Sequence, residues 1–228
     1  MSVYAGGDTH GDYQLDRLSS KKWPEGRELT KDDVLIICGD FGVLWRDIPD
    51  RTEHYWVSWL NSKPWTTCFA DGNHENHNRL QKLSREKKFD GTVGIISDSI
   101  FHLRRGEVYT ICGKKFFCFG GALSIDKHER TLNKTYWEEE VPSNDEMSYA
   151  VQNLDRHGNQ VDFIITHTVP NELVPMIGID RGLIDPTRNF LSFIASTIKF
   201  EKWFCGHFHI DKDISKYSIL YDRIIKII

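Results

Sequence analysis

The sequence predicts an α/β fold in which two β-sheets pack face to face and helices cover their outer surfaces. Two observations support this prediction: strand-like and helix-like segments alternate in the first part of the chain, and the second part is rich in short strands. With 228 residues the chain is long enough to bury a substantial core. Because no linker or repeat divides it, we expect a single domain over residues 1–228.

The first part of the chain alternates between strand and helix signals. Short apolar runs typical of buried strands occupy residues 3–7, 34–38 and 66–70. Helices are expected between and after these runs, over residues 14–20, 51–61 and 76–85. The segment 51–61 carries the clearest helical signal, because its aromatic residues recur on one face at helical spacing.

The second part of the chain predicts mostly strands. Four of them follow one another over residues 93–96, 100–103, 107–112 and 115–119. Later strands are expected over residues 161–166, 202–205, 218–221 and 223–228, with a helix over residues 188–199. Another helix begins at Ser143, which forms a capping-box pattern with Glu146. Residues 120–142 are polar and match no regular element, so we interpret them as a functional loop.

Five short polar clusters each follow an apolar, strand-like run. They are Asp8-Thr9-His10-Gly11, Gly39-Asp40, Gly72-Asn73-His74-Glu75, Thr166-His167 and Gly206-His207-Phe208-His209. Asp, Asn and His supply the oxygen and nitrogen ligands of hard and borderline divalent cations. One such cluster alone is usually a cap or a solvated turn. Five of them, each at the end of a strand, predict a binuclear metal centre.

The order of the clusters resembles the calcineurin-like metallophosphoesterase superfamily. Its signature runs D-x-H, G-D, G-N-H-[DE], a lone His and G-H-x-H, and all five parts occur here between Asp8 and His209. The resemblance implies a four-layer α/β/β/α sandwich of two mixed sheets flanked by helices. Residues 120–127 and the Gly39–Gly42 segment further resemble a subgroup of small bacterial metallophosphoesterases. That subgroup has no settled substrate to carry over.

The resemblance also implies which side chains would hold two divalent cations. One cation would take Asp8, His10, Asp40 and His209, and the other would take Asp40, Asn73, His167 and His207. Asp40 would bridge the pair. Manganese is the expected metal, with iron, zinc, cobalt and nickel as alternatives, because mixed nitrogen and oxygen ligation suits all of them.

Three further side chains are candidates for catalysis and substrate binding. His74 matches the histidine of the family that protonates the leaving oxygen or binds phosphate. The resemblance also implies that a hydroxide held between the cations would attack phosphorus. Lys127 and Arg130 lie in the polar loop and would grip a phosphate; the alternative is that both are solvated surface charges. A second basic pair, Arg104 and Arg105, has the same two interpretations.

The second motif differs from its form in Ser/Thr protein phosphatases, and this difference indicates the substrate class. Ser/Thr protein phosphatases of the superfamily continue it as G-D-x-V-D-R-G, whereas this chain reads G-D-F-G-V-L-W-R over residues 39–46. We therefore expect a phosphomonoesterase or phosphodiesterase acting on a small molecule or nucleotide. A Ser/Thr protein phosphatase, a nuclease and a non-catalytic metal-binding scaffold are the alternatives.

Composition limits which binding partners and which cellular compartment we expect. The net charge of −4 lacks the basic excess of proteins that bind extended nucleic acid. The longest apolar runs are too short to span a bilayer, and no signal-peptide pattern opens the sequence. Five cysteines without C-x-x-C spacing favour free thiols, so we expect no membrane association and a cytoplasmic location. The sequence leaves the oligomeric state open.

Overall fold

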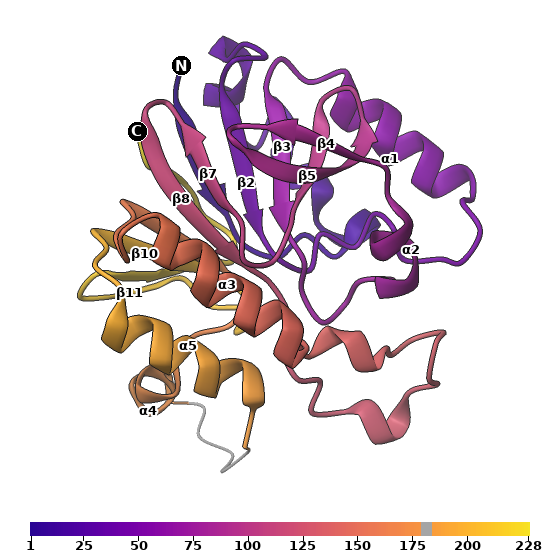
Figure 1. Cartoon of the computed structure of the whole chain (residues 1–228). Helices are drawn as coiled ribbons and strands as arrows, with labels where there is room; N and C mark the ends of the chain where they lie inside the picture. Colours follow the sequence, from indigo (N-terminus) through magenta and orange to yellow (C-terminus); the bar gives the residue numbers. More distant parts are fainter. Residues whose placement is uncertain (179–183) are drawn as a thin grey trace.

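Two mixed β-sheets lie face to face, with helices on the outer side of each. The structure is a computed structural model that describes residues 1–178 and 184–228. Figure 1 shows the two sheets in the middle of the molecule and both chain termini at the same end. The arrangement confirms the predicted four-layer α/β/β/α sandwich.

Within the described residues, the first sheet has seven strands in the order β13-β1-β2-β3-β6-β5-β4. Its four central strands run parallel and are β1 (Val3–Gly6), β2 (Val34–Cys38), β3 (Thr66–Ala70) and β6 (Ile100–Leu103). The others are β4 (Arg85–Lys88), β5 (Gly91–Ser97) and β13 (Ile224–Lys226). β13 pairs antiparallel with β1, so the two ends of the chain meet in one sheet.

The second sheet, counted over residues 1–178 and 184–228, has six strands in the order β11-β12-β10-β9-β8-β7. In chain order they are β7 (Val108–Ile111), β8 (Lys114–Phe119), β9 (Phe163–Thr166), β10 (Lys202–Cys205), β11 (Lys212–Ile214) and β12 (Tyr217–Ile219). The four inner strands run parallel, and β7 and β11 are antiparallel to their neighbours.

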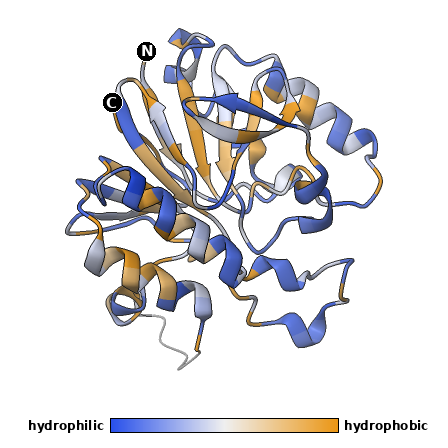
Figure 2. Cartoon of the chain, in the orientation of Figure 1, coloured by the Kyte–Doolittle hydropathy of each residue, from blue (hydrophilic) through white to orange (hydrophobic). Residues whose placement is uncertain are grey.

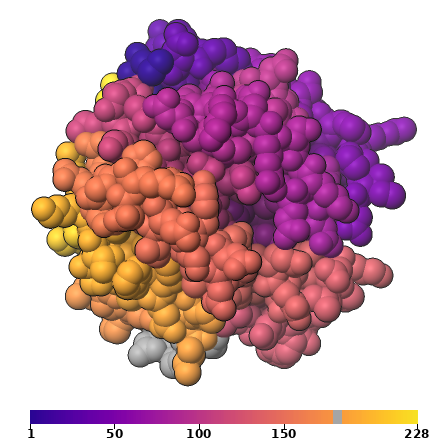
Figure 3. Space-filling view, viewed as in Figure 1, coloured from indigo at the N-terminus to yellow at the C-terminus, as the bar shows by residue number. Residues whose placement is uncertain are grey.

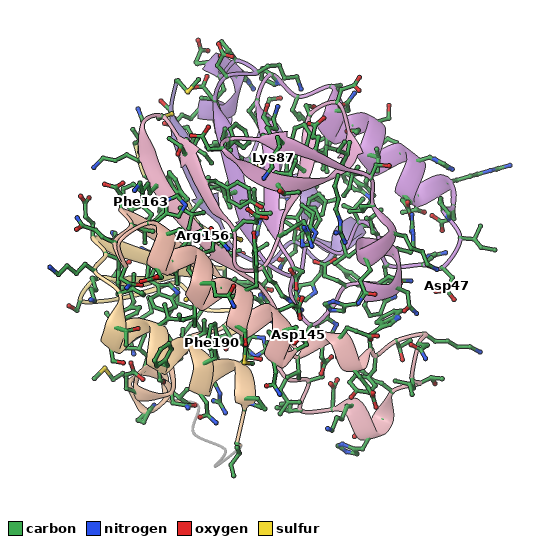
Figure 4. All side chains as sticks on the ribbon, viewed as in Figure 1. Asp47, Lys87, Asp145, Arg156, Phe163 and Phe190 are labelled. Atoms are coloured by element: carbon green, nitrogen blue, oxygen red, sulfur yellow. The ribbon has the colours of Figure 1, made fainter. Side chains whose placement is uncertain are left out.

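Helices cover the outer faces of the two sheets. α1 (Arg51–Asn61) and α2 (His77–Lys82) lie outside the first sheet, and α3 (Asn144–Arg156), α4 (Val174–Ile177) and α5 (Pro186–Thr197) lie outside the second (Figure 1). Figure 2 shows apolar strands behind a largely hydrophilic outer face of α3. Phe190 of α5, labelled in Figure 4, packs on Phe119 of β8 with ring centroids 4.7 Å apart.

The strands alternate their apolar side chains between two cores. In β8, Phe116 and Cys118 point into the core between the sheets, whereas Phe117 and Phe119 point towards α3 and α5. All four side chains are fully buried. This period of two, repeated in both sheets, is what joins them face to face and frees their other faces for helices.

Several sequence predictions match the structure at both ends of the element. The strands over residues 34–38, 66–70, 100–103 and 202–205 and the helix over 51–61 have the predicted bounds. Ser143 caps α3, and the reciprocal contact with Glu146 completes the predicted capping box. Asp50 caps α1 by accepting a hydrogen bond from the Glu53 amide.

Two predicted helices are wrong in part. The segment predicted as a helix over residues 14–20 contains only the short 3₁₀ turn η2 (Leu15–Leu18). Gln14 at φ −137° separates η2 from the preceding 3₁₀ turn η1 (Gly11–Tyr13), so no continuous helix forms. The helix predicted over residues 76–85 ends at Lys82, and its last residue instead begins β4, which pairs with β5. β4, β11 and α4 were not predicted, because segments of only three or four residues carry little periodic signal.

The five polar clusters all follow parallel strands. They come directly after β1, β2, β3, β9 and β10. The carboxyl ends of these strands lie at one edge of the sandwich, where loops from both sheets meet. Among the described residues, every helix is too short or too polar to cross a membrane.

Candidate metal centre

The first group of converging ligand atoms comes from the first and last clusters. The Nε2 atoms of His10 and His209 lie 2.9 Å apart, and His209 Nε2 lies 3.2 Å from Asp8 Oδ2. The three ligand atoms all fall within 4.8 Å of one another. Ligands about 2 Å from one cation are separated by roughly 3–4 Å, so this spacing fits a single shared ion.

The second group surrounds His167. Its Nε2 lies 3.0 Å from Asn73 Oδ1, 3.2 Å from His207 Nδ1 and 3.4 Å from Asp40 Oδ2. The imidazole is fully buried. Four clusters that are far apart in the sequence therefore present two nitrogen and two oxygen atoms to one point.

The tautomer of His167 decides which of its nitrogens is available to a cation. Nδ1 lies 2.9 Å from the carbonyl oxygen of Cys38 and donates to it, so Nε2 is the nitrogen that a cation would bind. Asp8 also lies near this ring, but its Oδ1 is 3.7 Å from Nδ1, the protonated side. Nε2 thus faces Asp40, and a backbone carbonyl orients the ring as is usual for metal-binding histidines.

Asp40 lies between the two groups. Its Oδ1 accepts a 2.7 Å hydrogen bond from the His74 amide, which leaves Oδ2 to face the ligands. Oδ2 lies 3.8 Å from His10 Nε2 in the first group and 3.4 Å from His167 Nε2 in the second. Asp8 is held in a similar way, because both of its carboxylate oxygens accept a 3.0 Å hydrogen bond from the His207 amide.

The ligand loops adopt left-handed backbone conformations that most residues avoid. Positive φ angles occur at His10 (46°), Asp40 (45°), His207 (73°) and His209 (51°). Such conformations cost energy and concentrate at functional sites. Gly39 is required beside them, since a Cβ atom there would lie 2.1 Å from His167 Nδ1.

The electrostatics of the centre call for a cation. Asp8 and Asp40 are both buried. Burial raises the pKa of Asp40, but the adjacent His167 outweighs this effect and holds it well below its ordinary value. Burial lowers the pKa of His167, and the carboxylates of Asp40 and Asp8 reverse the shift and raise it to about 10. A divalent cation would relieve the same negative potential, so this donor set fits divalent metal ions.

Comparison with protein families agrees with this geometry. The model of the calcineurin-like phosphoesterase family matches residues 1–211. The chain belongs to the calcineurin-like phosphoesterase family. The resemblance found in the sequence is therefore confirmed, and the match covers all five clusters. A comparison with curated proteins gave no match.

The candidate catalytic residue of this phosphoesterase, His74, lies at the edge of the ligand groups. Its ring centroid is 5.2 Å from that of His10 and 6.0 Å from that of Trp45. Both ring nitrogens lie beside the guanidinium of Arg130, at 3.2 Å from Nη1 to Nδ1 and 3.1 Å from Nη2 to Nε2. Burial lowers the pKa of His74; the carboxylate of Asp40 opposes this shift and Arg130 adds to it.

The two basic residues of the polar loop lie in different environments. Arg130 reaches His74 and is held there by a 2.7 Å ion pair with Asp126. Lys127 is exposed in a 3₁₀ turn and does not line the cavity beside the ligands. That cavity has a volume of about 330 Å³, and Arg130 lines it together with Asp40, Asn73 and His74.

Two acidic residues that the sequence analysis gave no role support the ligand loops. Glu140 accepts hydrogen bonds at 2.7 Å from the amide and hydroxyl of Ser124, whose Oγ accepts one at 3.1 Å from Asn73 Nδ2. This chain orients the Asn73 amide so that its oxygen faces His167. Glu75 accepts a 2.6 Å hydrogen bond from the Phe41 amide and so joins the second and third clusters. The G-N-H-E motif contains Glu75, whereas no sequence pattern marks Glu140.

Arg105, considered above as a phosphate-binding residue, instead forms a buried structural pair. Its guanidinium contacts Asp71 at 2.6 Å, and His102 Nε2 contacts the other oxygen of Asp71 at 2.9 Å. These side chains form the floor of a separate cavity of about 530 Å³, between the β4–β5 hairpin and the start of α3. Figure 3 shows this recess beside the salmon helix α3, and Asp145, labelled in Figure 4, lies on its rim.

Proposed function

We propose that this protein is a binuclear metal-dependent phosphoesterase that hydrolyses a phosphomonoester or phosphodiester of a small molecule or nucleotide. Membership of the calcineurin-like phosphoesterase family supports phosphoester hydrolysis. The observation that carries the binuclear assignment is the position of Asp40. Its Oδ2 faces one histidine of each ligand group, at 3.8 and 3.4 Å, as a carboxylate shared by two cations would.

The ligand atoms described above would hold the cations in two sets. Asp8, His10, Asp40 and His209 would bind one, and Asp40, Asn73, His167 and His207 the other. When bound, the cations supply Lewis-acid stabilisation of phosphoryl oxygens and activation of water. We propose manganese as the native metal, with iron, zinc, cobalt and nickel able to fit the same ligands.

The chain's own side chains would position the phosphoester and move a proton. Arg130 lines the cavity beside the ligand atoms and carries a fixed positive charge, so it would bind a phosphoryl oxygen. His74 lies between Arg130 and the ligand groups, where its imidazole would reach the leaving oxygen and protonate it. Lys127, exposed outside this cavity, would contribute at most a long-range charge.

The dimensions of the site support a small substrate. The cavity of about 330 Å³ is at the lower end of the roughly 300–1,000 Å³ found for small-molecule sites. The free thiols support a reducing compartment, and we propose the cytoplasm.

Metal exchange with a generic substrate pair tests the proposal. The purified protein is stripped with a chelator, reconstituted with each candidate metal, and assayed with 4-nitrophenyl phosphate and bis(4-nitrophenyl) phosphate. We expect no turnover after stripping, restored turnover after reconstitution, and two metal ions per chain by mass spectrometry. Undiminished hydrolysis by protein that contains no metal would refute the proposal.

A further inference from the structure

A further cavity shares His74 with the cavity that contains the ligand atoms. It has a volume of about 240 Å³, and His10 and His74 line it at the end nearest the ligand groups. Tyr13, Trp45 and Trp56 supply its aromatic walls. His74 therefore belongs to both cavities, the one that contains the ligand atoms and this aromatic one.

The aromatic walls come from three separate elements. Tyr13 ends the 3₁₀ turn η1 directly after the first cluster and is 85% exposed. Trp45 is braced by the fully buried Trp137, with ring centroids 5.4 Å apart. Trp56 lies on α1 with its ring 5.2 Å from Trp59. Trp45 and Trp56 are thus held by neighbouring rings, while Tyr13 is exposed at the cavity.

The polar groups of this cavity are mainly acidic. Three carboxylates and one guanidinium line it, and they belong to Asp12, Asp50, Glu53 and Arg46. Asp50 pairs with Arg46 at 2.5 Å, and Glu53 is held by Arg79 at 2.6 Å. Asp12 makes no hydrogen bond or ion pair within residues 1–178 and 184–228, so its carboxylate is available to an occupant.

The position of His74 assigns different parts of the substrate to the two cavities. Asp40, Asn73, His207 and Arg130 line the first cavity, which is where a phosphoryl group would bind under the proposed function. A general acid must lie within hydrogen-bonding reach of the leaving oxygen. The group attached to that oxygen would then extend past His74 into the cavity walled by Tyr13, Trp45 and Trp56.

We propose that the cavity walled by Tyr13, Trp45 and Trp56 is a leaving-group subsite for a flat aromatic group that carries hydrogen-bond donors, such as an amino-bearing nucleobase. This inference rests on the proposed function. Aromatic rings stack on tryptophan and tyrosine faces, and a free carboxylate accepts hydrogen bonds from an amino group. A volume of about 240 Å³ holds one ring system and excludes a long chain. The acidic lining disfavours an anionic leaving group such as a second phosphate.

Adenosine 5′-monophosphate and ribose 5-phosphate form a matched substrate pair for the test. In both, the leaving oxygen is the primary C5 oxygen of ribose, and only the first carries a base. For the manganese-loaded protein we expect kcat/KM at least tenfold higher for the nucleotide. Trp56→Ala should reduce this ratio about tenfold, and Trp56→Phe should retain most of it. Phe193→Ala, an exposed aromatic on α5 outside this cavity, is the control that should keep the wild-type ratio.

A binding measurement separates this inference from the proposed function. Calorimetric titration with adenosine and with ribose needs no turnover, and we expect saturable binding of adenosine that weakens about tenfold in Trp56→Ala. Two results together would overturn the subsite: similar kcat/KM values for adenosine 5′-monophosphate and ribose 5-phosphate, and no binding of adenosine. If the protein still hydrolyses nitrophenyl esters, the proposed phosphoesterase function stands. Failure to hydrolyse any ester would overturn the proposed function, and the adenosine titration would still decide whether the cavity takes the base.

Discussion

The guanidinium of Arg105 lies 2.6 Å from the carboxylate of Asp71, and both side chains are buried. Asp71 is two residues before Asn73, one of the proposed metal ligands. Burial raises the pKa of Asp71, but Arg105 outweighs it and keeps the carboxyl ionised. Arg105 also donates to the Glu139 carbonyl at 2.9 Å and reaches Glu146 of α3 at 3.2 Å. One side chain therefore joins the Asn73 loop, the polar loop and the second helical layer.

Replacing Arg105 should destabilise the protein strongly. Arg105→Met leaves the buried Asp71 carboxylate without its guanidinium partner and with only His102 beside it, and breaking such a buried ion pair costs about 3–5 kcal/mol of the free energy of unfolding. Urea denaturation measures this loss. The neighbouring Arg104→Met is the matched control, because Arg104 is only half-buried and forms no ion pair in the described residues. Equal stability of the two variants would show that Arg105 does not hold these loops together.

Asp40→Asn should remove the carboxylate shared by the two ligand groups. We expect lower metal content and a fall in kcat of several orders of magnitude, because the cations provide most of the transition-state stabilisation. Mass spectrometry of the bound metal and hydrolysis of a nitrophenyl ester measure both effects. Asp98→Asn, at an exposed aspartate distant in the sequence, should change neither. Two ions per chain and near-normal turnover in Asp40→Asn would contradict the shared-ligand assignment.

His74→Asn should retain both metals yet lose turnover selectively. If His74 protonates the leaving oxygen, the loss of turnover should be roughly 10²–10⁴-fold for an alkyl phosphoester. It should be smaller for a nitrophenyl ester, because nitrophenolate departs without being protonated. A series of esters with increasing leaving-group pKa measures this dependence. Equal losses across the series would indicate instead that His74 binds phosphate or orders the ligand loops.

Arg130 and Lys127 should behave differently when replaced. Arg130→Ala should lower kcat/KM about 10- to 100-fold, because the guanidinium beside His74 is lost from the cavity. Lys127→Ala should leave kcat/KM within about twofold, since the lysine is exposed outside that cavity. Steady-state kinetics on one substrate compares them, and equal effects would mean that the loop contributes only a diffuse charge.

Glu140 should make stability depend on pH. Burial raises its pKa from 4.5 to about 7, against the hydrogen bonds from Ser124 that lower it. The folded state therefore binds more protons than the unfolded state between pH 4.5 and 7, so the free energy of unfolding falls as pH rises through this window. Relative to Glu140→Gln, the wild type should lose roughly 3 kcal/mol between these limits. Urea denaturation at several pH values measures this difference. A constant difference in the free energy of unfolding between the two proteins from pH 4.5 to 7 would rule out this titration.

Local signals in the sequence determined most of the strands, several helix boundaries and the residue types at the candidate metal centre. The run at residues 34–38 is apolar throughout, and the Ser143 capping box acts within four residues, so neither depends on distant contacts. The order of Asp, Asn and His motifs identified the family before any geometry was known, because a cation restricts which residue types can bind it.

The tertiary structure alone decided which charges reach the site and which are buried. Arg130 lies 56 residues after His74 and Arg105 lies 34 residues after Asp71, and no local pattern encodes either contact. The same holds for the aromatic cavity, whose walls come from η1, the loop after β2 and α1. Strand order and sheet packing set these contacts: Asp71 and Arg105 follow the adjacent parallel strands β3 and β6 of one sheet, whereas the loop that carries Arg130 follows β8 of the other sheet and meets His74 across the two.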